Sequence, residues 1–215
     1  MAERNQYRQQ YMSLRQQQEA LGLLSGADTS GPISGYLCYR GGPFIATTSL
    51  VGAAFVFWRA GFRAFYLVKY GRGRVATLAF SLITAAHGGF LHEMFVNGKL
   101  RDYWANEDPW YYAKSAAIAH QPGLLICFTG AFTLNYVFSS RSALLPVVDT
   151  LYPKETRFKL FRYIASRYKP YYRSIASVWV MSTLLMTYVG YRALEERQQV
   201  IFEVTNRKTL SLKEG

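Results

Sequence analysis

The chain has little cysteine and few acidic residues. Its 215 residues include 2 cysteines, Cys38 and Cys127, and no CxxC pair. Paired cysteines build zinc and iron–sulfur sites, so a framework of that kind is excluded. The two cysteines are far apart in sequence and Cys127 lies in a long apolar stretch, so we interpret each as a small apolar side chain. Asp and Glu number 13 against 25 Lys and Arg, which gives a formal net charge of +12.

Charge is also missing from four long apolar windows. They cover residues 41–58, 75–91, 115–140 and 174–191, and none of them contains Asp, Glu, Lys or Arg. A helix needs about 20 mostly apolar residues to cross about 30 Å of hydrocarbon, and only a helix satisfies its own backbone there. The alternative is a soluble protein with four core helices, which is disfavoured because core helices usually keep a charged face.

The windows predict an all-α membrane protein with about four transmembrane helices. The expected spans are about 41–58, 75–97, 115–140 and 174–194. They form a bundle over 41–194, between a polar N-terminal extension (1–40) and a polar C-terminal tail (195–215). Little length remains for a separate catalytic domain. A three-span arrangement, with the first window on the membrane surface, stays open.

Small residues recur on the first two windows. Ala46, Ser49 and Ala53 follow helical spacing in the first, and the second contains Thr84 and Ala85 before the pair Gly88-Gly89. Small side chains let helices approach closely inside a membrane. The pattern predicts tight packing of these two helices.

The third connecting loop has the pattern of a basic amphipathic helix. Phe158, Phe161, Ile164, Ala165 and Tyr168 recur at helical spacing among basic residues. Such a helix lies in the membrane surface and attracts anionic lipid. We therefore predict an interfacial helix over about 154–172 and bound phospholipid such as cardiolipin. The residues expected to contact lipid are Arg59, Arg63, Arg72, Arg74, Arg157, Arg162, Arg167, Lys169 and Arg173.

An acidic neighbouring protein is the alternative partner for that helix. Nucleic acid is not expected, because the basic residues adjoin spans and no recognition module is present. The first and third loops have the strongest local excess of basic residues, and basic loops stay on the inner side. Both termini are then expected on the outer side, in the intermembrane space or the periplasm. The first residues lack a secretory pattern, so a mitochondrial address is expected to be internal and uncleaved.

Three histidines are candidates for function, because ionisable residues inside membranes often mark it. His87 lies deep in the second window, His92 toward its outer end, and His120 near the start of the third window. Histidines from two helices can hold a haem, so His92 and His120 are candidate ligands. The simpler interpretation is that each histidine forms a hydrogen bond to a neighbouring helix. His92-Glu93 resembles the start of HExxH, but Val96 stands where the second histidine belongs.

Other catalytic patterns are missing. The Gly-Arg-Gly-Arg run at 71–74 lacks the spacing of a phosphate-binding loop, and no nucleophile–base pair is recognisable. We therefore expect no enzymatic activity, no metal and no cofactor.

These features favour a non-catalytic accessory subunit of a large energy-transducing complex in the mitochondrial inner membrane. The host would be a respiratory-chain complex or an ATP synthase, and the chain would stabilise assembly, contact other membrane subunits and bind anionic lipid. A bacterial inner membrane is the alternative location. A haem- or quinone-binding redox anchor remains an alternative function. A small transporter is a second alternative, disfavoured because no carboxylate lies in a window and the halves show no symmetry.

Overall fold

The computed structural model describes residues 36–64, 71–101, 106–141 and 153–211. These residues form helices and no strand, which confirms the all-α prediction. In chain order the elements are α3 (Gly42–Ala64), α4 (Gly71–His92), the π-helix η3 (Glu93–Asn97), α5 (Gly98–Arg101), α6 (Pro109–Arg141), α7 (Pro153–Tyr168), the 3-10 helix η4 (Lys169–Tyr171) and α8 (Tyr172–Ser211).

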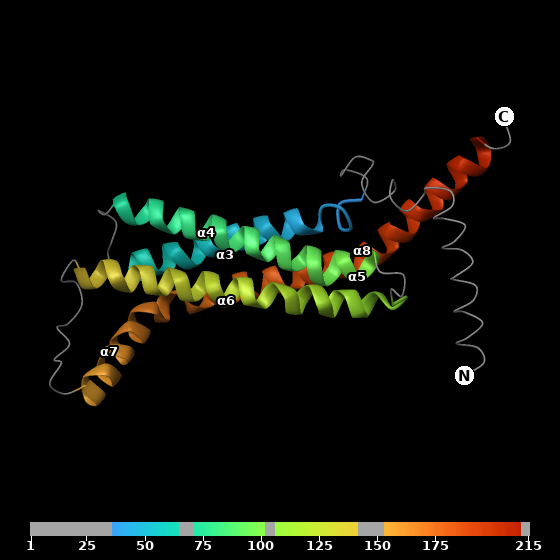
Figure 1. Cartoon of the computed structure of the whole chain (residues 1–215). Coiled ribbons are helices and arrows are strands. Elements are labelled where there is room, and N and C mark those ends of the chain that lie inside the picture. The colour runs from blue at the N-terminus through green and yellow to red at the C-terminus, as the bar shows by residue number, and fades with distance from the viewer. Residues whose placement is uncertain (1–35, 65–70, 102–105, 142–152, 212–215) are drawn as a thin grey trace.

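Four long helices, α3, α4, α6 and α8, lie side by side with alternating direction (Figure 1). The α4 helix continues through η3 into α5. Among the described residues, three helical stretches are long and apolar enough to cross a membrane: Gly42–Ala64, Pro109–Val137 and Arg162–Val200. The α8 helix runs well past the expected boundary at residue 194 and ends at Ser211.

Small side chains lie where the helices of the bundle approach one another. Ala46, Ala53 and Ala85 are buried, as their spacing predicted. Gly88 of α4 lies directly against the Leu50 side chain of α3, and Gly190 of α8 lies against the backbone of α6. Close helix approach through small residues is typical of bundles in lipid, where the packing cannot rely on excluding water.

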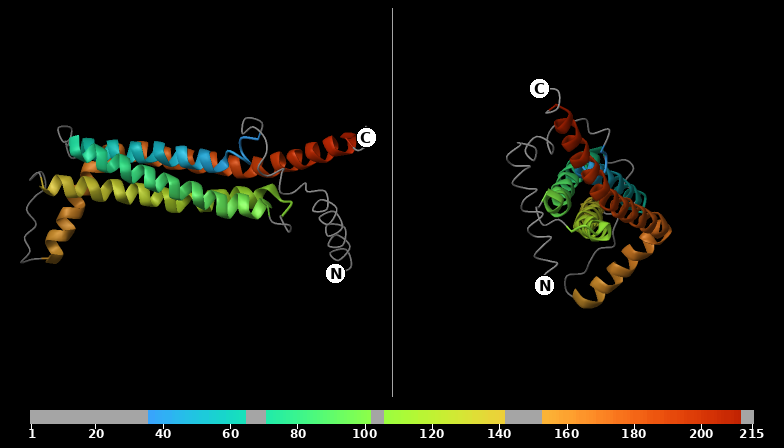
Figure 2. Two further views of the ribbon diagram at one scale, coloured as in Figure 1. Left: turned by 45° about the horizontal axis from the view of Figure 1, so that its top comes forward. Right: turned by 90° about the vertical axis from the view of Figure 1, so that its right-hand side faces the viewer.

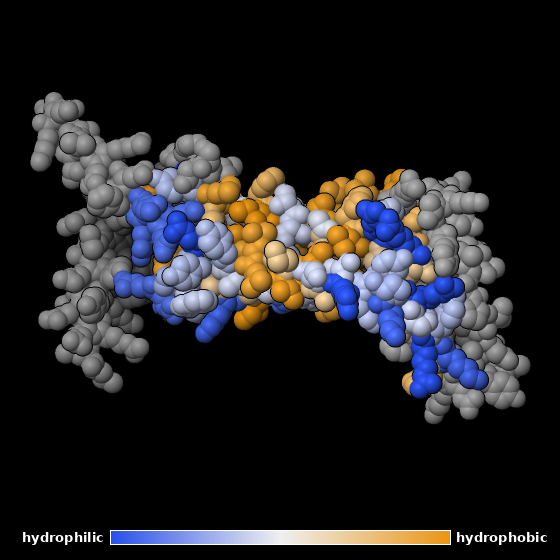
Figure 3. Space-filling model, turned by 180° about the vertical axis from the view of Figure 1, so that it is seen from behind, coloured by the Kyte–Doolittle hydropathy of each residue, from blue (hydrophilic) through white to orange (hydrophobic). Residues whose placement is uncertain are grey.

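Large apolar side chains cover the outside of the same helices. Figure 3 shows them as a hydrophobic band across the middle of the molecule, with hydrophilic residues at both ends. The exposed large apolar side chains of these helices include Phe44, Phe55, Val75, Leu78, Leu82, Ile83, Phe90, Ile118, Leu125, Val180, Met181, Leu184 and Leu185. Such a continuous apolar surface marks contact with lipid or with another protein.

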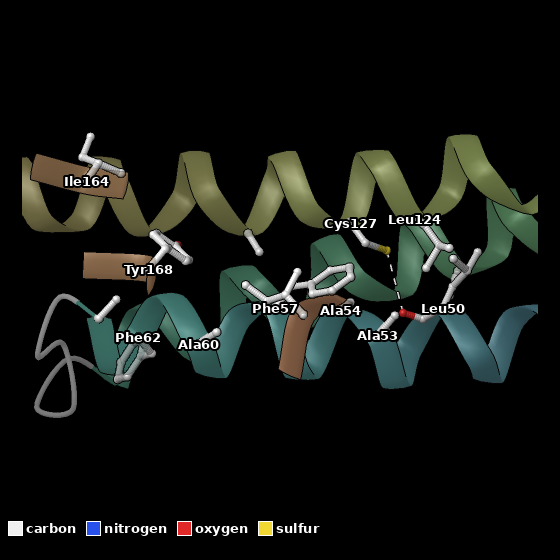
Figure 4. Close-up of a cluster of buried hydrophobic side chains, with 14 residues drawn as sticks. Leu50, Ala53, Ala54, Phe57, Ala60, Phe62, Leu124, Cys127, Ile164 and Tyr168 are labelled. Atoms are coloured by element: carbon white, nitrogen blue, oxygen red, sulfur yellow. Dashed lines mark hydrogen bonds between the residues drawn. The ribbon is translucent and has the colours of Figure 1, made fainter. Parts of the chain in front are cut away.

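Two buried clusters fill the bundle along its length. The first joins α3, α4, α6 and the region where α7 meets α8, and Figure 4 shows part of it around Phe57 and Leu124. In this cluster the Cys127 thiol donates to the Leu50 carbonyl at 3.8 Å. The second cluster lies at the opposite end and contains Tyr112, Met186 and the turn before α3. Both cysteines are free and buried.

The α7 helix runs across the bundle axis (Figures 1 and 2). Ile164 and Tyr168, near its C-terminal end, are buried against the bundle, whereas Phe158 is exposed. The Tyr168 ring packs on Phe132 of α6, with ring centroids 5.8 Å apart. The predicted helix in this loop is therefore present, and it is attached to the bundle through its C-terminal half.

Two glycines test whether close packing stabilises the bundle. A Cβ at Gly190 would collide with the Tyr112 carbonyl and the Ala116 side chain, whereas a Cβ at Gly52 would meet nothing within 4 Å. We expect Gly190→Ala to lower the free energy of unfolding in mixed detergent micelles by about 1–3 kcal/mol, the usual cost of overpacking. Gly52→Ala should raise it by about 0.5–1 kcal/mol, because alanine favours the helix. Equal effects of the two changes would contradict the packing described here.

Candidate functional site

The two histidines proposed as ligands are both buried inside the bundle. His92, at the end of α4, is 1% exposed, and His120 of α6 is 2% exposed. The two rings come from separate helices, as the sequence predicted, and each adjoins α3. His92 lies against Gly42, whereas His120 lies beside Ser49. These two positions on α3 are separated by about 10 Å along the helix axis, at 1.5 Å per residue.

His120 belongs to a polar cluster that links three helices. Its Nε2 lies 2.8 Å from Oγ of Ser182 in α8 and 3.5 Å from Oγ of Ser49 in α3. The two serine oxygens are themselves 2.5 Å apart. The tautomer of the ring decides which group donates in each pair. Hydrogen bonds between helices replace the water that these groups lose on burial.

A second polar contact lies one residue further along α6. Trp179 Nε1 of α8 donates to Gln121 Oε1 at 2.9 Å. Gln121 Nε2 then donates to Thr183 Oγ1 at 3.1 Å. Three hydrogen bonds thus join α6 to α8 within two helical turns. The sequence contains these residues in its apolar windows, but it gives no sign of their pairing.

His92 has a different environment. Among the described residues, neither of its ring nitrogens has a hydrogen-bond partner. A Cβ at Gly42 would come within 2.5 Å of His92 Nε2, so the ring packs directly on the α3 backbone. The π-helix η3 begins at the next residue. Single π-helical turns often occur at functional sites, which keeps His92 a candidate.

The carboxylate of Glu93 is held by its own helix. Its Oε2 accepts from Asn97 Nδ2 at 2.7 Å, and its Oε1 pairs with Arg101 Nη1 at 2.7 Å. No group of three His, Cys, Asp or Glu side chains within the described part of the chain is placed to hold a metal ion. Glu93 thus serves the local structure of the turn that follows α4.

Axial haem ligation requires a nitrogen of each histidine to face one iron. His92 Nε2 faces the α3 backbone, whereas His120 Nε2 faces Ser182 of α8. His120 therefore forms a polar link between helices, whereas His92 packs on α3 without a hydrogen bond among the described residues. Ligation of a common iron would require the rings to turn.

The basic residues predicted to bind lipid gather at one end of the bundle. Arg59 and Arg63 are exposed on the last turns of α3, and Arg162, Lys169 and Arg173 are exposed where α7 turns into α8. Arg72 and Arg74 lie in the first turn of α4 and Arg157 in α7, but their side chains lie outside the described part. The carboxylates whose side chains are described all lie toward the opposite end: Glu93, Glu107, Asp108, Glu195 and Glu196.

Arginines of α7 stack on aromatic rings of the same helix. The guanidinium of Arg162 lies 4.6 Å from the centre of the exposed Phe158 ring. Arg167 lies 5.3 Å from the Tyr163 ring and donates to the Tyr163 hydroxyl at 3.1 and 3.2 Å. Stacking of this kind holds a guanidinium beside an apolar surface, as a helix at the lipid headgroups requires.

A carboxylate attaches the turn before α3 to α8. Glu196 Oε2 accepts from the backbone N–H of Cys38 at 2.8 Å and from that of Tyr39 at 2.9 Å. Burial, reinforced by the negative charge of Glu196, raises the pKa of the Cys38 thiol to about 12. The thiol is therefore protonated at neutral pH and poorly nucleophilic. Glu196 was not identified from the sequence, because its partners are backbone groups.

Comparison with protein-family models, with curated proteins and with solved structures finds no match for this chain. Its function has to be inferred from its own residues.

The polar cluster makes a testable contribution to stability. Ser182→Ala removes the closest partner of His120, so the free energy of unfolding in detergent should fall by about 1–2 kcal/mol, the cost of an unsatisfied buried polar group. Ser177→Ala on the exposed side of α8 is the matched control, and its effect should stay within about 0.5 kcal/mol. If both variants lose the same stability, the hydrogen bonds of His120 are not what holds α6 to α8.

The Glu196 contact predicts the reactivity of Cys38. In a Cys127→Ala background, Glu196→Ala should speed labelling of Cys38 by a maleimide, because loss of the carboxylate lowers the thiol pKa and frees the turn. The free energy of unfolding of Glu196→Ala should fall by about 1–3 kcal/mol, since hydrogen bonds to a charged group are lost. Glu195→Ala removes a carboxylate that pairs with Arg192 instead, so both properties should change little. Unchanged labelling in Glu196→Ala would show that the turn is held by other contacts.

Proposed function

We propose that the chain crosses a membrane four times and acts as a non-catalytic structural subunit of a larger membrane complex. The outward face of α4 supports a fourth span. It carries exposed Val75, Leu78, Leu82, Ile83 and Phe90, and its inward face packs on α3 through Gly88 and Gly89. Contact of these side chains with water would be unfavourable. A fully exposed side chain of this size costs about 1.5–3 kcal/mol relative to a buried one.

The length of α8 is the observation that carries the proposal. Its 40 residues extend about 60 Å at 1.5 Å per residue, about twice the thickness of the hydrocarbon. The helix continues past the ends of its neighbours (Figure 1). A helix that is not packed on other protein is only marginally stable in water. The extension therefore favours a partner protein at the outer end of the bundle.

The opposite, basic end supports the lipid part of the proposal. The α7 helix runs across the bundle axis there (Figure 2), with exposed Phe158 and Arg162. A helix in this orientation suits the plane of the headgroups, where its basic residues would meet lipid phosphates. Each Lys or Arg at such a surface contributes about 1 kcal/mol. We propose that anionic lipid such as cardiolipin binds here, together with Arg59 and Arg63 of α3.

The same end sets the proposed orientation. Basic loops stay on the inner side of a membrane, so the α7 end would face the mitochondrial matrix and both termini the intermembrane space. We propose a respiratory-chain complex or ATP synthase of the mitochondrial inner membrane as host, with a bacterial inner membrane as the alternative. This choice rests on the small size of the chain, its basic inner end and the lack of a catalytic constellation among the described residues.

Native electrophoresis of detergent extracts, followed by mass spectrometry, tests the proposal. The full chain should migrate in a particle many times its own mass of 24.5 kDa. A chain ended at Val200 keeps both buried clusters but lacks the end of α8, so it should be lost from that particle. A stable, monodisperse monomer formed by the full chain would contradict the proposal.

A redox anchor is the second candidate, and the burial of His92 and His120 in the bundle favours it. It predicts a Soret absorbance band in the purified chain or complex that disappears in His92→Ala and in His120→Ala. A purified complex without such a band would exclude haem at this site.

A further inference from the structure

His87 is a polar residue on the apolar outer face of α4. It is exposed, whereas its neighbour Gly88 faces inward and lies against Leu50, which also meets Gly123 of α6. His87 is therefore level with the middle of the bundle. It lies about 20 Å along the axis from either end of the continuous α4–α5 helix, at 1.5 Å per residue. An imidazole at this depth cannot reach the headgroups on either side.

The surroundings of His87 offer it no polar contact. Its neighbours one turn away on the outer face are Ile83 and Phe90, both large, apolar and exposed. Among the described residues, no hydrogen bond or ion pair of the His87 ring is present. Polar and ionisable side chains within a membrane almost always face protein or water rather than lipid, because hydrocarbon offers no hydrogen bonds. Something other than lipid tails must therefore cover this face.

We propose that the outer face of α4 docks against a transmembrane helix of another protein that presents a hydrogen-bonding side chain to His87. This inference rests on the proposed function, because it requires a membrane complex. Ala79 and Ala86 are exposed on the same face, and small side chains let a second helix approach closely enough for the bond to form. Ile83 and Phe90, one turn away on either side, supply the apolar contacts around it.

A different protein fits this face better than a second copy of the chain. A symmetric dimer places the same patch of both copies face to face, and both copies share one orientation in the membrane. The first turns of the two α4 helices would then meet, and each contains Arg72 and Arg74. Like charges brought together there repel, although water and ions at the headgroups screen them, so self-association through α4 is disfavoured.

Photocrosslinking in native membranes tests the docking. A benzophenone amino acid at Ile83, one turn before His87 on α4, should form an adduct with one membrane protein, through a transmembrane peptide that carries a polar side chain. The adduct should fall about 3- to 30-fold when His87→Leu is added, the range expected for one hydrogen bond between membrane helices. His87→Gln should retain the adduct, because the glutamine side chain can still form the hydrogen bond to the partner helix. The same amino acid at Val180 on α8 is the control, and the yield of its adducts should not change when His87→Leu is added.

Other outcomes overturn the inference. Adducts at Ile83 with lipid only, adducts with a second copy, or an adduct that persists in His87→Leu would each do so. The isolated His87→Leu chain should remain as stable as the parent in detergent, so that a lost adduct does not reflect misfolding. Retention of the chain in a large particle without an Ile83 adduct would overturn the docking but leave the proposed function standing. A monomeric chain would overturn both.

Discussion

The fold depends on small side chains at the points where the helices approach most closely, and on large apolar side chains that remain on the outer faces. Gly88 against Leu50 and Gly190 against α6 bring the helices close, while side chains such as Ile83 and Met181 remain exposed. In water this arrangement would leave a wide apolar surface uncovered. In lipid it is stable, because each helix satisfies its own backbone and the close approach maximises packing contacts. The polar groups around His120 hydrogen-bond to one another across three helices inside the bundle, since hydrocarbon offers them no partner.

The two ends of the bundle differ in chemistry, and the difference organises the proposed roles. One end combines α7 with basic side chains, which suits a charged membrane surface. The other end carries the described carboxylates and the extended α8. There Glu196 attaches the turn before α3 to that helix through two backbone hydrogen bonds. In the proposed role, one end would contact lipid and the other would contact protein.

Much of the fold could be predicted from the sequence, because apolar windows and small residues are local signals. The close packing at Ala46 and Ala53 follows from their helical spacing, and that at Ala85 from the patch of small residues around it. The end of α8 was missed because residues 195–211 are polar, although they contain no Gly or Pro and many good helix formers. The link between His120 and Ser182 could not be predicted, since it depends on how two separate helices are rotated. For the same reason the depth of His87 was predictable, but not the direction in which it faces.

Spin-label accessibility in the purified chain, reconstituted alone in bilayers, tests most directly whether the outer faces lie in lipid. Labels at Ile83 on α4 and at Met181 on α8 should be broadened by oxygen, which concentrates in hydrocarbon, and protected from a water-soluble nickel reagent. A label at Arg63, beyond the apolar band, should show the reverse. Strong nickel broadening at Ile83 or Met181 would mean that these faces lie in water, and the membrane bundle, its orientation and its partners would have to be abandoned.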